Sequence, residues 1–435
     1  MPLILLVLYA GDLTAGALRT ARLAFRDTVL VDELLVMLPT LATLALTWLV
    51  FYPIDRRLRE SAMIGRVDQG LPLYPPPTRG QYILANLRHQ VALLFVPLVI
   101  ITAWSESVML LGPDGRGVLT ATQAMLLAPA GALGVFLLAP LIIRHVWDTA
   151  PLPPGEVRES MAALCRLHRV KVRELLLWRT YGVLINAAVM GLVGPLRFIL
   201  LSDALLDQLR QREVEAVMAH EIAHVRKHHM FWMMLVLIAT LALGEQAAHG
   251  LLLFADRSLA DAGGATLAGI DLRELIRDER AQVILIAMLS LAGAMSVFGW
   301  VSRRIERQAD VFAARHLSQT TEQPAKDAAG RLLFEHDACK TMVQALQQVA
   351  VLNHIPTRRK SWRHGSIRWR QDHLKSLVGK PLDDAEVDRV LGRVKLVALA
   401  AVALLGVLYW FQSQGGVEVQ PILVHAAAII PGLPH

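Results

Sequence analysis

Residues 217–238 read VMAHEIAHVRKHHMFWMMLVLI and join a polar segment directly to an apolar one. In the polar part, apolar residues recur with helical spacing, which predicts an amphipathic helix over residues 211–229. The apolar part begins a run over residues 230–254, which is longer than the ~20 residues that cross the hydrocarbon of a bilayer. The stretch therefore predicts a helix that ends where a membrane begins.

Within that helix, His220-Glu221-Ile222-Ala223-His224 has the form HExxH. Residues four apart lie on one helical face, so His220 and His224 are placed to hold one Zn²⁺, with Glu221 about 100° round the helix. A carboxylate in that place is suited to take a proton from water and pass it on. The motif predicts metal-assisted hydrolysis, although the five residues alone also recur by chance.

The composition indicates an integral membrane protein. Hydrophobic residues make up 54% of the chain and charged residues only 19%, and the mean hydropathy is +0.44, which is too apolar for an ordinary soluble protein. Residues 2–10 fit a cleaved signal peptide poorly, because no basic residue precedes them. Six stretches predict membrane spans: 34–52, 91–111, 118–143, 230–254, 282–301 and 396–412.

The distribution of lysine and arginine predicts the orientation of these spans. Basic residues concentrate in 53–90, 144–229 and 302–395, and they are scarce in 112–117 and after 412. The positive-inside rule then places both termini outside and both large polar segments in the cytoplasm, although the arginine-bearing loop 255–281 departs from the alternation. The same bias accounts for a pI of about 9.6, and no basic patch with interleaved aromatic residues indicates nucleic-acid binding.

The two cysteines, Cys165 and Cys339, fall in the predicted cytoplasmic segments. A disulfide is not expected in the cytosol, and neither cysteine has the Cys-x-x-Cys or Cys/His spacing of a metal site. Both are expected to be small core residues.

The polar segment before the motif predicts a small sheet. Residues 156–167 have helical spacing after Pro153, Pro154 and Gly155, and residues 170–177, 183–190 and 197–201 are rich in the branched and large apolar residues that favour strands. The predicted order is therefore a helix, three strands and then the motif helix.

A catalytic zinc site takes a third protein ligand and leaves one position for water. Two predicted spans follow the motif, so the chain returns to the same side of the membrane just before Glu306. Glu306 and Asp310 lie four apart on one helical face, which suits Glu306 as the third ligand and Asp310 as an acceptor for the free N–H of a ligating histidine. The alternative is that these acids only pair with nearby arginines on a solvated face.

HExxH followed after two spans by ExxxD resembles the integral-membrane zinc endopeptidases that include HtpX and the type I CAAX prenyl protease. The sequence around Asn186, with residues 200–206 after it, is similar to the family's edge strand and the helix that follows. His364-Gly365-Ser366 with Arg370 resembles the family's His-Pro-Ser-x-x-x-Arg signature, but Gly365 stands where proline is usual. The resemblance covers about residues 155–380.

The resemblance implies one Zn²⁺ per chain, held by His220, His224 and Glu306, with Glu221 as general base. It also implies that Asp310 orients His220, and that Asn186 on an exposed edge strand holds the substrate backbone by β-augmentation. His364 and Arg370 would stabilise the developing oxyanion or position Glu306, although for His364 an ordinary interfacial histidine is the alternative. His228 and His229 are expected to be polar residues at headgroup level, with His229 facing away from the motif.

The expected fold is mainly α: a polytopic helical membrane protein of about six spans with a cytoplasmic zincin-like α+β protease domain carrying a small sheet. The expected regions are 1–147 with about three spans, 148–229 with the edge strand and motif helix, 230–301 with two spans, 302–394 with the third ligand, and 395–435 with the last span and an outer tail.

The expected function is zinc-dependent endoproteolysis of membrane-associated or misfolded proteins, in a bacterial inner membrane, with the active site facing the cytoplasm. Prenyl-protein processing is the alternative within the same class, because the six predicted spans lie between the about seven of that branch and the fewer of HtpX-like enzymes. From another class, the alternative is a non-catalytic zinc-containing membrane sensor or scaffold, which three convergent ligands disfavour because structural zinc sites are usually closed by four.

Overall fold

The computed structural model describes residues 20, 31–68, 75–113, 115–181, 184–261, 266–267, 270–383 and 385–413. The predictions for residues 2–10 and for the tail after 413 lie outside this part. The chain divides into two compact units. We call Met1–Ala163 with Lys171–Gln208 the sheet unit, and Leu164–Val170 with Leu209–His435 the motif unit.

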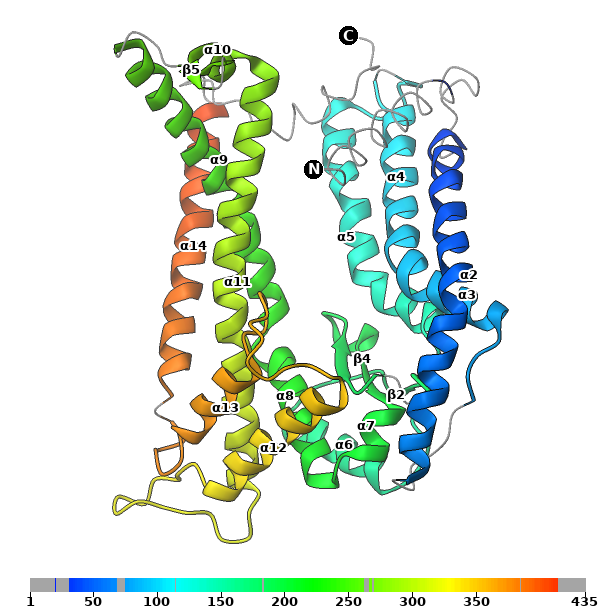
Figure 1. The fold of residues 1–435 in the computed structure, drawn as a ribbon. Helices are drawn as coiled ribbons and strands as arrows, with labels where there is room; N and C mark the ends of the chain where they lie inside the picture. The colour runs from blue at the N-terminus through cyan, green and yellow to red at the C-terminus, as the bar shows by residue number, and fades with distance from the viewer. Residues whose placement is uncertain are drawn as a thin grey trace. The chain divides into compact units, whose positions relative to one another are not determined.

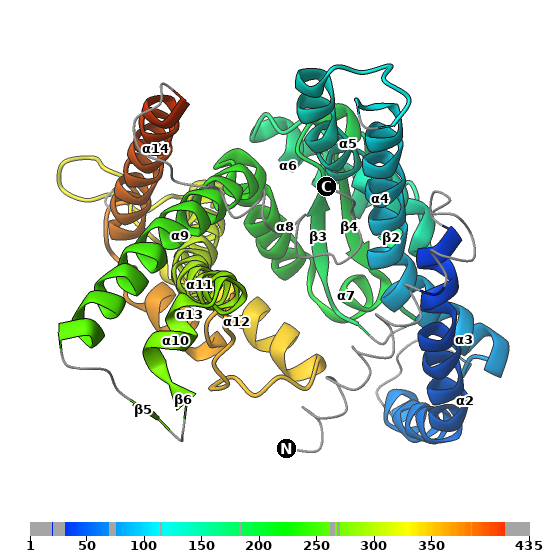
Figure 2. The same ribbon diagram turned by 90° about the horizontal axis from the view of Figure 1, so that it is seen from above.

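The sheet unit begins with long apolar helices (Figure 1). Thr78 and Thr120 each precede a helix and form a capping box with the glutamine three residues on, which satisfies backbone N–H groups that the first turn leaves free. Helices α4 and α5 lie side by side (Figures 1 and 2). The helices of this region are α2 (Val31–Asp68), α3 (Arg79–Asn86), the π-helix η1 (Leu87–Ala92), α4 (Leu93–Leu111) and α5 (Ala121–Val146).

A four-stranded sheet forms the rest of this unit, in the order β1-β2-β4-β3. Strand β2 pairs with β4 in parallel, whereas β1 and β3 pair antiparallel with β2 and β4, so β3 lies at an edge of the sheet. The side chains of β4 are all buried, and Leu141, Ile143 and Trp147 pack against the core beside it. The elements are β1 (Thr149–Pro151), α6 (Glu156–Leu167, of which the residues from Leu164 on belong to the motif unit), β2 (Glu174–Trp178), β3 (Ala187–Met190), the 3-10 helix η2 (Gly194–Leu196), β4 (Phe198–Ser202) and α7 (Asp203–Gln208).

The motif unit holds the remaining helices, and in it α9, α11 and α14 run side by side (Figures 1 and 2). Asp271 and Asp278 cap α10 and α11 by accepting backbone N–H groups of the first turn. The elements are α8 (Gln211–Arg226), α9 (His229–Asp261), β5 (Thr266–Leu267), β6 (Ile270–Asp271), α10 (Leu272–Arg277), α11 (Glu279–Gln319), α12 (His336–Leu352), α13 (Ile367–Lys375) and α14 (Glu386–Ser413).

Within the described residues, five helices are long and apolar enough to cross a membrane, and a sixth candidate is a pair bent by 43°. The predicted polytopic helical architecture with a small sheet is therefore confirmed. The five helices are Met37–Ser61, Ala121–Val146, His229–Asp261, Ala281–Gln319 and Glu386–Val407, and the bent pair is Arg79–Ala92 with Phe95–Leu111.

Several predicted bounds were wrong. The motif helix ends at Arg226 rather than at 229, because His228 takes a left-handed conformation with φ of 54° and the chain turns before α9 begins. Among the described residues, the strand predicted over 183–190 comprises only 187–190, and β1 at Thr149–Pro151 was not predicted. Cys165 and Cys339 are buried thiols, as expected of small core residues.

Candidate metal centre

Helix α8 presents the first two candidate ligands. Its apolar residues Ala219, Ile222 and Ala223 are fully buried, and this packing fixes the rotation of the helix. His220 is therefore buried and His224 half-buried on the same side, with their Nε2 atoms 3.3 Å apart.

Helix α11 brings the third candidate ligand to this pair. Glu306 is 7% exposed, and its Oε2 lies 3.6 Å from Nε2 of His220. One donor atom from each of His220, His224 and Glu306 lies within 4.8 Å of the other two. The structure thus brings together donor atoms from His220 and Glu306, which are 86 positions apart in the sequence, and from His224.

The donor set fits zinc in chemistry and spacing. Two imidazoles and one carboxylate are typical ligands of a catalytic zinc site. At Zn–N distances of about 2.0–2.1 Å, two tetrahedral ligand atoms lie about 3.3–3.4 Å apart, which the 3.3 Å between the two Nε2 atoms matches. Two buried carboxylates, those of Glu306 and Asp310, pair with one buried guanidinium, that of Arg370. Among the described residues of this cluster the buried charge is therefore negative, which favours a cation.

Asp310 holds the first imidazole from the side away from the centre. Its Oδ1 lies 3.0 Å from Nδ1 of His220, and its carboxylate has no exposed surface. Burial opposes the charged form of His220, but the hydrogen bond to Asp310 and its negative charge hold the pKa of His220 above its ordinary value. For His224, burial lowers the pKa to about 3, and the neighbouring His220 adds to this shift.

Arg370 on α13 connects the two carboxylates. Its Nε and Nη2 lie 2.8 and 2.6 Å from the two oxygens of Asp310, and its Nη1 lies 3.2 Å from Oε2 of Glu306. Although burial opposes its charge, the carboxylate of Asp310 and then that of Glu306 raise the pKa of Arg370 above its ordinary value. A guanidinium paired in this way fixes the direction of both carboxylates.

His364 reaches the site from the loop before α13. Its Nδ1 lies 2.9 Å from Oε1 of Glu306, and about half of its side chain is exposed. Gly365 has φ of 74°, a conformation that proline cannot adopt, and a Cβ there would lie 3.0 Å from the ring of Trp369. The glycine at this place in the His-x-Ser signature is therefore required by the turn that this chain makes.

Glu221 and Asn186 are the remaining predicted site residues. Glu221 is half-buried on α8, and its charge acts on Arg370. Asn186 is exposed directly before β3, its N–H donates to Oγ of Ser202 at 3.0 Å, and its carbonyl accepts from the N–H of Ser202 at 3.0 Å. Asn186 belongs to the sheet unit, whereas the remaining candidate residues belong to the motif unit.

The sequence interpretation of His229 was wrong. This residue is 2% exposed, and its Nδ1 lies 3.0 Å from Nδ1 of His224. Its Nε2 lies 2.8 Å from Oε1 of Gln308, and Nε2 of Gln308 donates to Asp388. The only sequence signal for this contact was that His229 follows His224 by five residues. That spacing lets His229 face the motif only if the helix breaks between the two residues.

Two comparisons with known proteins found a similarity to this chain. Residues 155–361 match Peptidase family M48. The fold is similar to that of the crystal structure of S. mikatae Ste24p, with a TM-score of 0.50 and 16% identity, over 85% of this chain and 82% of that one. No curated protein matches the chain in sequence.

Proposed function

Because this chain is a membrane metallopeptidase of family M48 over residues 155–361, we propose that it is a zinc endopeptidase with one metal per chain. His220, His224 and Glu306 hold the metal, and Glu221 is the general base. The observation that carries this proposal is the convergence of the three donor atoms within 4.8 Å from two helices that a long apolar hairpin separates in the sequence.

When bound at such a site, zinc polarises a carbonyl oxygen and makes water more acidic. Glu221 lies beside the ligand face of α8 and accepts a proton from the attacking water. It then delivers this proton to the leaving amine, which must be protonated before the peptide bond can break.

Asp310, Arg370 and His364 position these groups. Oδ1 of Asp310 lies 3.0 Å from Nδ1 of His220, and its negative charge favours a hydrogen on Nδ1, which leaves the Nε2 lone pair for the metal. Arg370 and His364 each contact a different oxygen of Glu306, which favours positioning of that ligand as their role. The exposed side of His364 remains available to donate to an oxyanion.

The substrates are protein segments in extended form. Strand β3 is an edge strand, and Asn186 precedes it with an exposed side chain, so an added peptide strand can pair there through its backbone. Backbone pairing gives loose side-chain preference, which suits membrane-associated or misfolded proteins. A prenylated protein is a narrower substrate of the same chemistry.

The location follows from the spans. An integral membrane protein with basic segments on either side of α9 and α11 is expected to keep the metal centre in the cytoplasm, at the bacterial inner membrane.

The test compares wild type with Glu221→Gln, both purified in detergent, on a denatured and fluorescently labelled protein. Both should bind one zinc per chain, and the variant should cleave about 10²–10⁴-fold more slowly. Equal cleavage by the two proteins would remove Glu221 as the base. Tight zinc binding without any cleavage by wild type would favour the sensor or scaffold instead.

A further inference from the structure

The Nδ1 atoms of the two candidate histidine ligands contact different kinds of partner. Each presents Nε2 to the centre and Nδ1 outward. Nδ1 of His220 lies 3.0 Å from the carboxylate of Asp310, which can only accept, so this contact favours a hydrogen on Nδ1 of that ring. Nδ1 of His224 instead faces another imidazole nitrogen, in His229, which can either donate or accept. The contact between these two rings alone therefore does not fix the tautomer of His224.

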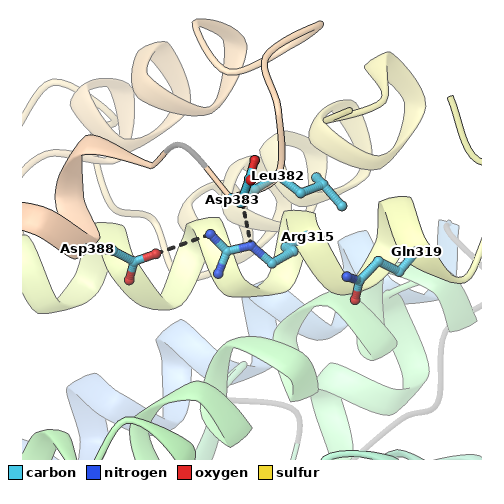
Figure 3. Close-up of a pocket in the computed structure, with 5 residues that line it drawn as sticks. All are labelled: Arg315, Gln319, Leu382, Asp383 and Asp388. Atoms are coloured by element: carbon cyan, nitrogen blue, oxygen red, sulfur yellow. Dashed lines mark hydrogen bonds and ion pairs between the residues drawn. The ribbon is translucent and has the colours of Figure 1, made fainter. Parts of the chain in front are cut away.

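Gln308 and Asp388, the next two residues in the chain of contacts, decide which of these two nitrogens donates. Nε2 of Gln308 donates to Oδ1 of Asp388. The Asp388 carboxylate also lies 3.1 Å from Nη2 of Arg315 and 3.4 Å from Nζ of Lys227, so it is an ionised acceptor. Figure 3 shows Asp388 and Arg315 at the side of a pocket that Gln319, Leu382 and Asp383 also line. The amide of Gln308 can hence point only one way, with its oxygen toward His229.

The remaining hydrogens then follow in order. Because Oε1 of Gln308 accepts, Nε2 of His229 must donate across the 2.8 Å between them. A neutral imidazole has one N–H, so Nδ1 of His229 accepts from Nδ1 of His224. The second imidazole is left with a lone pair on Nε2, directed at the centre.

We propose that His229, Gln308 and Asp388 are positioning residues that set the tautomer of His224, as Asp310 does for His220. The proposal rests on the proposed function, because it takes His224 as a metal ligand. Both imidazoles then direct lone pairs at one point 3.3 Å apart, an arrangement that a cation between them stabilises. The hydrogen-bonded chain runs from α8 through the start of α9 and the second half of α11 to the first turn of α14.

The test measures zinc affinity by competition between the metal-free protein in detergent and a chelator of known affinity. Gln308→Met interrupts the chain of hydrogen bonds, and Asp388→Asn lets the Gln308 amide reverse and place a hydrogen on Nε2 of His224. Each variant should bind zinc about 10–100-fold more weakly than wild type. The hydrogen bonds of Gln308 go to His229 and Asp388, and the polar contacts of Asp388 go to Gln308, Arg315 and Lys227.

Arg315→Gln is the matched control, because it removes a cation from the same carboxylate but leaves the Gln308 hydrogen bond. It should lower the thermal stability of the metal-free protein without changing zinc affinity. If Asp388→Asn and Gln308→Met bind zinc as tightly as wild type, or if Arg315→Gln loses the same affinity, the three residues are only structural and the proposal is overturned.

Nitrogen NMR of zinc-loaded, histidine-labelled wild type covers the case in which the variants do not fold. It should show His224 with hydrogen on Nδ1 and metal on Nε2, and the opposite assignment would overturn the proposal. The two proposals also fail differently. A wild type that binds no zinc refutes the proposed function, whereas equal zinc affinities of wild type and the two variants refute only the positioning role of His229, Gln308 and Asp388.

Discussion

At the residue scale, the candidate centre is unusual for the charge it buries. Asp310 has no exposed surface, and Glu306 and Arg370 are each 7% exposed. Such charges are stable inside a protein only when they are paired and hydrogen-bonded. The bidentate contact of Arg370 with Asp310 and its further contact with Glu306 meet this condition.

Arg370→Met should destabilise the metal-free protein by about 3–5 kcal/mol, because two buried carboxylates lose their common partner. Arg370→Lys should recover only part of this loss, since an ammonium cannot reproduce the planar fork of a guanidinium. Thermal or denaturant unfolding in detergent measures the effect. Arg368→Met is the control on the same helix, because its side chain is 57% exposed. Equal stability of the Arg370→Met and Arg368→Met proteins would contradict the assignment.

His364→Ala should leave the protein folded, because the His364 side chain is about half exposed. Glu306 loses the contact at Oε1, so activity or zinc affinity should fall about 10–100-fold, as for other residues that hold a metal ligand. Peptidase assays and chelator competition measure the two effects. His336→Ala, an exposed histidine at the start of α12, should behave as wild type. If the His364→Ala protein equals the His336→Ala protein in activity and zinc affinity, His364 has no part in the centre.

At the element scale, the sequence predicted what depends on repeated local patterns. Helix α6 has the predicted bounds, because its apolar spacing and the Pro-Pro-Gly before it leave little choice. The three-residue β1 has no pattern of its own and forms only through its partner β2. The turn at His228 was missed because a left-handed conformation at a histidine has no sequence signal comparable to glycine.

The candidate site was predictable to a similar degree. His220, His224 and Glu221 follow from helical spacing, and Glu306 with Asp310 follows from spacing and an even number of spans. His364 and Arg370 came only from the family resemblance, because nothing local links residues 364–370 to α11. The contacts of His229, Gln308 and Asp388 depend on how four helices pack, which local sequence patterns do not encode.

A chain of side chains links the segment after α6 to α8 and α11. Nε2 of His168 lies 3.1 Å from Nδ1 of His316, whose Nε2 lies 3.0 Å from Oε1 of Glu215. Burial lowers the pKa of His168 to about 4, and the charges of His316 and Arg226 add to this shift. An unfolded histidine has a pKa of about 6.5, so between these values the unfolded chain binds a proton that the folded chain does not.

Stability should therefore fall as the pH drops from about 6.5 toward 4, and His168 should add no pH dependence above that range. His168→Gln should lose less stability over this interval than wild type, because the titrating group is gone. Melting temperatures at a series of pH values measure the difference. His336→Gln, which removes an exposed histidine, should keep the wild-type slope. If His168→Gln also keeps it, His168 is not the group that titrates.

At the scale of the whole molecule, α11 carries out two tasks. Its 41 residues extend about 60 Å, roughly twice the ~30 Å of bilayer hydrocarbon. The apolar first half can cross the membrane, and the polar second half then presents Glu306 and Asp310 beyond it. The same arrangement explains how two spans bring the third ligand back to the side of the HExxH helix.

This topology predicts opposite sides for the hairpin tip and the loop that carries His364. In a background without Cys165 and Cys339, Glu274→Cys on intact cells should react with a membrane-impermeant maleimide. Lys360→Cys should react only after the membrane is permeabilised, and both exposed positions should react in detergent. Labelling of Lys360→Cys, but not of Glu274→Cys, on intact cells would reverse the proposed orientation.

The proposed function requires that two imidazoles and the Glu306 carboxylate bind a single zinc ion. X-ray absorption at the zinc edge, on wild type and Glu306→Ala, tests it most directly. We expect one zinc per wild-type chain, with two nitrogen ligands at about 2.0–2.1 Å and oxygen ligands at about 2.0–2.2 Å. The Glu306→Ala protein should lose the metal or one oxygen ligand. A wild-type spectrum with sulfur ligands, or one that Glu306→Ala leaves unchanged in both content and shape, would contradict it.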